Sequence, residues 1–179
     1  MESHQSEVAI KEISSQILKC LVDFCYTSSV KIHSSNVLDL LSAANMLQFD
    51  GIKQCCSNYL AGKLDPHNCL SIAKYADLYT CDVLKETAID FSKKHFREVS
   101  QSEDFVKISF QQIKTLLQSE AISVTSEIDI FHALVTWIQH DKGDRLKYFM
   151  DLFQLVRFLD IPPKLLGRLG FIQWNLEDN

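Results

Sequence analysis

Apolar residues recur at the three- and four-residue spacing of a helix face along most of this chain. Such spacing places the apolar side chains on one side of a helix, where they can pack against a neighbouring element. In the first third of the chain, three such stretches follow a residue able to cap a helix: Ser14 or Ser15, Ser35, and Asp50. We expect a helix after each. Their apolar stripes are Ile17, Leu18, Leu21, Val22 and Cys25; Val37, Leu40, Leu41, Ala44 and Leu47; and Ile52, Cys55, Cys56, Tyr59 and Leu60.

From Asp65 onward the pattern predicts a series of helical hairpins. Asp65 can accept hydrogen bonds from the first free backbone N–H groups of a helix. Pro66 suits the first helical position, where its missing N–H costs nothing. The apolar stripes that follow are Leu70, Ala73 and Ala76; Leu84, Ala88 and Phe91; Phe131, Leu134, Val135 and Ile138 after Ser126; and Leu146, Phe149, Leu152 and Phe153.

Local signals refine this second part. The pairs Ser100–Glu103 and Ser109–Gln112 have the spacing of a capping box, which predicts a helix start at each. Residues 141–144 are polar and predict a turn, and Pro163 can begin a short last helix. We expect Trp137, on an apolar stripe, to anchor the core.

Two windows lack a helical stripe and predict short strands, residues 7–13 and 30–32. The whole chain has only five glycines and three prolines. A β-propeller or a dinucleotide-binding fold needs more glycines for its tight turns and close backbone approaches. The predicted fold class is therefore all-α, mainly helical, with one or two short strands.

Charge and hydropathy argue against nucleic-acid binding and against membrane insertion. The net charge is −5, and the longest basic run is Lys93-Lys94, so we expect no nucleic-acid surface. No apolar run approaches the length of a membrane span, and the polar N-terminus does not read as a signal peptide. We expect no membrane partner and a cytoplasmic protein, with the nucleus as a second possible location.

Metal and catalytic motifs are missing from the sequence. The six cysteines form no C-x-x-C pair, which fits small buried hydrophobes in a reducing compartment. His132 and His140 lie eight residues apart, whereas two metal ligands on one helix prefer four. There is no G-x-S-x-G, Gly-rich phosphate loop or H-E-x-x-H. We therefore expect no enzyme, no metal and no cofactor.

Several stretches together resemble BTB (POZ) and BACK domains of Kelch-like proteins. The phrases similar to the later part of a BTB domain are Leu21-Val22-Asp23-Phe24-Cys25-Tyr26-Thr27, 36–48 and Cys55-Cys56-Ser57-Asn58-Tyr59-Leu60. The junction resembles 64–70, and the BACK-like markers are Ala88, Phe91, 95–99, Glu103, Phe105 and Phe131-x-Ala133-x-x-x-Trp137. The resemblance implies a partial BTB fold over 1–63, a BACK array of helical hairpins over 64–170, and an unassigned tail over 171–179.

The resemblance also implies a role. Kelch-like proteins hold cullin-3 and present a substrate for protein ubiquitination, so the chain resembles a substrate adaptor of a cullin–RING ubiquitin ligase. The alternative is a BACK-type scaffold or a decoy that recruits no ligase. The substrate cannot be inferred from this sequence. A pull-down with cullin-3 would separate the two interpretations.

The implied cullin-binding candidates are Glu2, Asn45, Met46, Gln48, Phe49, Tyr59, Asp65 and Asn68. Glu2 matches the acidic residue of the family's hydrophobic-x-Glu motif, but no residue fills the hydrophobic position two places earlier. Met46 and Phe49 could instead belong to the core, and Asp65 can serve simply as a helix start.

The front of the BTB domain, with its dimerisation helix, and the Kelch repeats have no counterpart in the sequence. The chain therefore resembles a fragment, a shortened product or an incomplete gene model, and a family-type homodimer is not expected. The missing front would leave apolar side chains less covered, so residues 1–63 should be the less stable half. The side chains concerned are Leu18, Leu21, Val22, Leu40, Leu41 and Leu47.

Overall fold

The computed structural model describes residues 12–118 and 127–157, and all regular structure in these residues is helical. Two compact units form: the first comprises residues up to 64 together with 72–87, and the second comprises 65–71 together with residues from 88 onward. The predicted all-α class is confirmed.

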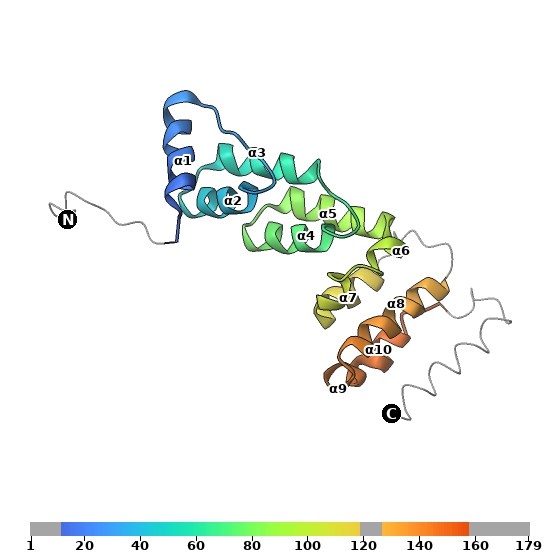
Figure 1. Cartoon of the computed structure of the whole chain (residues 1–179). Helices are drawn as coiled ribbons and strands as arrows, with labels where there is room; N and C mark the ends of the chain where they lie inside the picture. Colours follow the sequence, from blue (N-terminus) through green and yellow to red (C-terminus); the bar gives the residue numbers. More distant parts are fainter. Residues whose placement is uncertain (1–11, 119–126, 158–179) are drawn as a thin grey trace. The chain divides into compact units, whose positions relative to one another are not determined.

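The described helices follow one another along the chain as labelled in Figure 1. Their bounds are α1 Ser15–Thr27, α2 Val37–Met46, α3 Asp50–Ala61, α4 Cys69–Leu78, α5 Asp82–Lys94, α6 Phe96–Val99, η1 Phe105–Lys107, α7 Phe110–Leu117, α8 Glu127–His140, α9 Lys142–Arg145, η2 Leu146–Tyr148 and α10 Phe149–Phe153. The three helices expected between residues 14 and 61 are all present.

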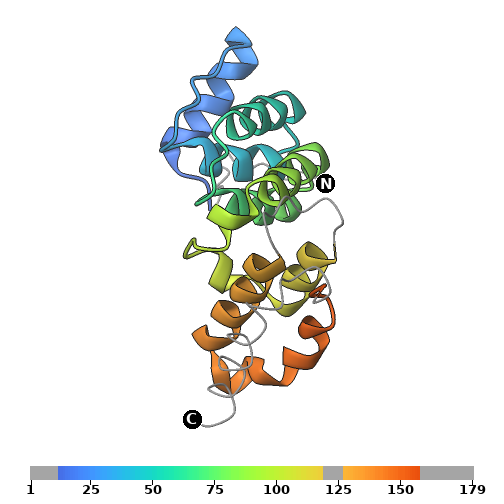
Figure 2. The same cartoon turned by 90° about the vertical axis from the view of Figure 1, so that its right-hand side faces the viewer.

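In the first unit, α2 lies beside α3, and α1 packs against α2 (Figures 1 and 2). Leu21, Leu40, Leu41 and Ile52 fill the core between them and are essentially inaccessible to solvent. These residues come from the predicted apolar stripes, so burial of one face per helix explains the packing.

The helix starts of the first unit match the predictions only in part. Ser14 caps α1, and its hydroxyl oxygen accepts a hydrogen bond from the Ile17 amide at 3.4 Å. Ser35 was expected to cap α2, but the capping position is held by Asn36. Asp50 was expected to cap α3, but it is the first helical residue, preceded by Phe49. At that position its carboxylate still interacts favourably with the positive N-terminal end of the helix dipole.

The strand predicted over residues 30–32 is wrong, because these residues form an irregular connection between α1 and α2. The Asn36 side chain holds it: Oδ1 accepts from the His33 amide at 2.9 Å and Nδ2 donates to the Lys31 carbonyl at 3.0 Å. With no strand among the described residues to pair with, an isolated extended segment gains no ladder of hydrogen bonds. The other predicted strand, 7–13, falls mostly outside the described residues.

The apolar side chains of the first unit are more deeply buried than the sequence analysis predicted. Leu21, Leu40 and Leu41 are buried, whereas Val22 remains 47% exposed. Leu18 and Leu47 are half-buried. The helices thus cover most of their own apolar stripes, and the α1 face that carries Val22 is the part left open to solvent.

In the second unit, aromatic side chains make the core. Trp137, Phe96, Phe105 and Phe131 are fully buried, and the rings of Phe96 and Phe105 meet edge to face at 6.1 Å. As predicted, Trp137 anchors this core, and its indole N–H donates to the Ile108 carbonyl at 2.9 Å. The indole's polar atom is therefore satisfied inside the core.

Two capping boxes were predicted in the second unit, and one forms. Ser109 and Gln112 hydrogen bond reciprocally at the start of α7. Ser100 instead ends α6, and its hydroxyl donates to the Arg97 carbonyl. The hydroxyl oxygen of Ser102 accepts a hydrogen bond from the Phe105 amide at 3.2 Å. The spacing of Ser100 and Glu103 was right for a capping box, but the preceding helix runs on to residue 99.

The turn predicted over residues 141–144 is also wrong, because α9 occupies Lys142–Arg145. Nη1 of Arg145 donates to the carbonyls of Val106 at 2.8 Å and Trp137 at 2.9 Å. These bonds tie the polar segment to η1 and α8, a tertiary effect that local polarity does not reveal. The helix start expected at Ser126 and the last helix expected at Pro163 lie outside the described residues.

Candidate protein-interaction surface

The turn between α2 and α3 presents four of the predicted site residues together. Asn45 and Met46 end α2, and Gln48 and Phe49 form the connection to α3. The Met46 side chain is 47% exposed, Gln48 is exposed, and Phe49 and Asn45 are half-buried. Met46 therefore does not belong to the core.

Backbone hydrogen bonds fix this turn. Gln48 adopts a left-handed conformation with φ of 59°. The Phe49 amide donates to the Ala44 carbonyl at 2.8 Å, and the Gln48 amide donates to the Asn45 carbonyl at 3.4 Å. This is the Schellman arrangement that satisfies the last carbonyls of a helix. The same arrangement ends α4, where Thr80 has φ of 52° and the Cys81 amide donates to the Ala76 carbonyl.

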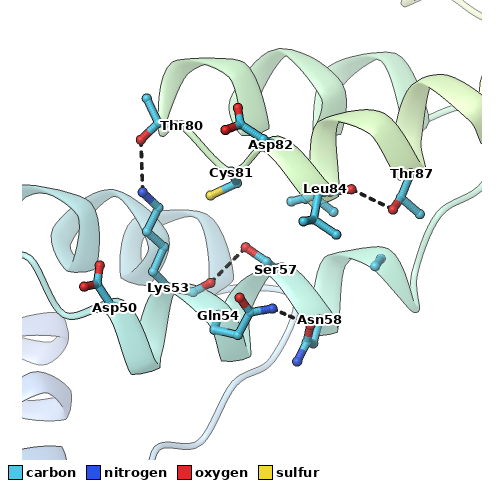
Figure 3. A pocket seen from close by; sticks show the side chains of 12 residues that line it. Asp50, Lys53, Gln54, Ser57, Asn58, Thr80, Cys81, Asp82, Leu84 and Thr87 are labelled. Carbon is cyan, nitrogen blue, oxygen red and sulfur yellow. Dashed lines mark hydrogen bonds between the residues drawn. The ribbon is translucent and has the colours of Figure 1, made fainter.

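Lys53 of α3 connects these two helix ends. Its ammonium group donates to Asn45 Oδ1 at 3.0 Å. It also donates to Thr80 Oγ1 at 3.1 Å (Figure 3). A positive charge beside the C-terminal ends of α2 and α4 is favoured by both helix dipoles. Lys53 therefore holds the α2–α3 turn against the α4–α5 turn within the first unit.

A groove of about 310 Å³ lies between α3 and the first half of α5 (Figure 3). Its lining includes the buried residues Ser57, Cys81 and Leu84, and also Val83, which is 76% exposed. The other lining residues are Asp50, Lys53, Gln54, Asn58, Ala61, Thr80, Asp82 and Thr87. A lining that mixes carboxylates, amides and a few apolar side chains suits an extended peptide better than a small apolar ligand.

Two buried thiols, those of Cys56 and Cys69, are chemically unreactive. Burial is the main reason that the pKa of Cys56 is raised to about 12, and the neighbouring Cys55 and Cys81 contribute to the same rise. In the second unit, burial raises the pKa of Cys69 to about 11. Both side chains are protonated at neutral pH, and a thiol in that state is a poor nucleophile and a poor metal ligand.

Tyr59, on α3, is half-buried. Asp65 and Asn68 belong to the second unit, whereas the α2–α3 turn belongs to the first. Asp65 Oδ1 accepts from the His67 amide at 2.8 Å and the Asn68 amide at 3.1 Å, in the turn before α4. Asn68 Oδ1 accepts from the Asp65 amide in return. Pro66 was expected to be the first helical residue, but α4 begins at Cys69. Glu2 lies outside the described residues.

The sequence reasoning missed Lys53, Thr80, Asp82 and Val83 as part of this surface. Lys53 follows Asn45 by eight residues and precedes Thr80 by 27, and no periodicity connects the three. A signal did exist for Thr80, because it lies between the apolar stripe that ends at Ala76 and the stripe that begins at Leu84, where a helix boundary is expected.

The described residues contain no group of three or more His, Cys, Asp and Glu side chains placed to hold a metal ion. His132 and His140 are both exposed. Within 12–118 and 127–157, the helices are too short or too polar to cross a bilayer.

Comparison with known proteins identifies the family. Residues 69–169 match the BACK family, described as BTB And C-terminal Kelch, and residues 1–64 match the BTB/POZ domain. The chain belongs to the BTB–BACK family. Kelch-like protein 3 of Pongo abelii is 36% identical over 161 residues, which are 90% of this chain. Kelch-like protein 3 of Bos taurus and that of Homo sapiens are each 35% identical over the same length.

The Kelch-like resemblance expected from the sequence is thereby confirmed. The BTB–BACK chain spans about a quarter of its curated relatives, since the aligned residues make up 27% of each. The BTB match covers α1, α2 and α3, and the BACK match begins at the first residue of α4.

Proposed function

We infer that this chain is a protein-interaction module of the cullin-3 adaptor type. It would bind cullin-3 through the α2–α3 turn (Asn45, Met46, Gln48 and Phe49), and an unidentified substrate would be ubiquitinated by the recruited ligase. The observation that carries this proposal is the exposed apolar side chain of Met46 beside a turn that Lys53 and two backbone bonds hold in place, in a chain of the BTB–BACK family.

A large apolar side chain at the centre of an interface contributes much of the binding energy, and a rigid support reduces the entropy lost on binding. Met46 is flexible and polarisable and so adapts to a partner surface. An adaptor of this kind performs no chemistry of its own. It raises the effective concentration of a target near the ligase.

The test is a titration of the purified chain with purified cullin-3 by isothermal calorimetry. Met46→Glu should weaken binding by about tenfold or more, because an interfacial carboxylate would be buried without a partner. Met150→Glu is the matched control, since Met150 is another exposed methionine, 60% accessible, in the second unit. It should bind like the unchanged chain.

Circular dichroism of both variants separates lost binding from lost folding. Unchanged affinity of a folded Met46→Glu variant would reject the α2–α3 turn as the contact. If the unchanged chain binds no cullin-3 at all, the adaptor proposal fails, and the BACK-type scaffold or decoy becomes the better interpretation.

A further inference from the structure

A stack of aromatic rings flanked by lysines lies on the second unit. The rings of Phe110 in α7 and Tyr148 in η2 are nearly parallel, at 14°, with centroids 4.1 Å apart. Lys114 Nζ lies 5.6 Å from the centroid of Phe110, and Lys147 Nζ lies 5.1 Å from that of Tyr148. We call Phe110, Lys114, Lys147 and Tyr148 the cationic aromatic surface.

Contacts with the buried Trp137 hold this surface in place. Tyr148 contacts the buried Trp137, with ring centroids 6.5 Å apart. The Arg145 guanidinium lies 4.2 Å over the Trp137 ring, and its two hydrogen bonds to carbonyl oxygens fix the segment that leads to Lys147. The rings are thus ordered before any partner arrives, which lowers the entropy cost of binding.

Lys114 and Lys147 each lie over an aromatic ring rather than beside a carboxylate of the described residues. Ion pairs in the described residues neutralise other lysines, Lys85 with Asp77 and Lys93 with Asp90 among them. Among the same residues, Lys114 and Lys147 form no ion pair, and each meets an aromatic ring instead. The acidic residues nearest Lys147 along the chain, Asp144 and Asp151, are exposed. With no ion pair among the described residues, the ammonium groups of Lys114 and Lys147 can donate to carboxylates of another molecule.

The number of charges selects the class of partner. Nucleic-acid binding typically neutralises several phosphates, and an anionic membrane surface is bound by clusters of about four to eight cations. Two lysines on a chain of net charge −5 match neither. They do match a short protein segment with a few carboxylates. Leu146, 39% exposed, and Met150, 60% exposed, flank Lys147 and Tyr148 in sequence and supply apolar contact area.

We propose that the cationic aromatic surface binds an acidic peptide segment of a partner protein, with carboxylates on Lys114 and Lys147 and an apolar side chain against the rings. In an adaptor, this surface would hold a second protein besides the ligase. The proposal does not depend on cullin binding, because it involves residues of the second unit alone.

Fluorescence anisotropy of the full chain with a labelled peptide of alternating glutamate and leucine tests the proposal. The matched probe is a lysine–leucine peptide of the same length. The acidic peptide should bind and the basic one should not. Affinity should fall as salt is raised, because the attraction is between partly exposed charges.

Charge reversal locates the site. The double variant Lys114→Glu and Lys147→Glu should lose at least about tenfold in affinity for the acidic peptide. The control is Lys19→Glu with Lys31→Glu, which changes the net charge equally at exposed positions of the first unit. It should bind nearly as the unchanged chain does. Tyr148→Ala tests the ring contact and should weaken binding with both lysines in place.

Several outcomes would overturn the proposal. One is equal loss of affinity in the two double variants, which would mean nonspecific attraction. Another is no binding of the acidic peptide while an RNA oligonucleotide or anionic phosphatidylserine vesicles bind through Lys114 and Lys147. Circular dichroism and thermal unfolding show whether each variant is folded, and Lys114→Gln with Lys147→Gln, a milder change, repeats the test if the reversal unfolds the chain.

Discussion

Lys53 Nζ lies 3.1 Å from Thr80 Oγ1, so one ammonium group connects α3 to a helix end 27 residues further along the chain. The same nitrogen reaches Asn45 Oδ1. Each oxygen sits at the C-terminal end of a helix, where the backbone carbonyls concentrate negative partial charge. This arrangement joins the predicted contact residues to the groove between α3 and α5.

Replacing Lys53 with methionine should lower the free energy of unfolding by about 1 kcal/mol, because a charge favoured by two helix dipoles and two hydrogen bonds is lost. The loss stays modest because water can reach both oxygens. Urea denaturation measures it. Lys19→Met, at an exposed position in α1, is the control and should change stability by less than about 0.5 kcal/mol. Equal effects of the two variants would contradict the role given to Lys53.

Gln48 holds a left-handed backbone conformation that only glycine adopts without steric cost. Gln48→Gly should therefore raise the free energy of unfolding by about 1 kcal/mol. Gln54→Gly, within α3, is the matched control and should lower it by about 1 kcal/mol, since glycine is unfavourable inside a helix. If both glycines destabilise the chain, the left-handed turn is not a source of strain.

Arg145 makes three contacts that lysine cannot reproduce together: two hydrogen bonds to carbonyls and a stack on Trp137. Arg145→Lys should lower the free energy of unfolding by about 1–2 kcal/mol, since two partly buried carbonyls lose their shared donor. Arg97→Lys, at an exposed position in α6, should leave it nearly unchanged. A fluorescence-monitored urea titration measures both variants.

The helices could be predicted from sequence because each has an apolar stripe that one packing face buries. The stripes with Leu40 and Leu41 or with Phe131 and Leu134 gave the correct helices and core residues. Helix caps were also predicted correctly where no preceding helix extended to the capping residue, as at Ser14 and Ser109. The family resemblance rested on phrases that span these same helices.

Contacts between distant residues could not be predicted. Residues 141–144 are polar and predict a turn, but Arg145 donates to the Val106 carbonyl, 39 residues earlier, and residues 142–145 form a helix. Ser100 has the right spacing for a cap, yet the packing of Phe96 and Val99 extends the preceding helix to it. The candidate site was predicted in part: the residues of the α2–α3 turn were named from the sequence, but Lys53 and the groove between α3 and α5 were not.

The buried thiol of Cys56 should make stability depend on pH in the alkaline range. Folding raises its pKa from 9.0 to about 12, so between these values the folded chain keeps a proton that the unfolded chain releases. Because the unfolded state then binds fewer protons, the free energy of unfolding falls as pH rises above about 9, by roughly 1.4 kcal/mol for each further unit.

Urea denaturation of Cys56→Ala at pH about 7 and about 10 measures this contribution. The variant should be less stable than the unchanged chain at the lower pH, because a small cavity replaces the thiol, but its stability should fall less on going to the higher pH. Cys55→Ala removes the exposed neighbouring thiol and should leave the pH dependence close to that of the unchanged chain. The same pH dependence in all three proteins would show that the Cys56 thiol does not control alkaline stability.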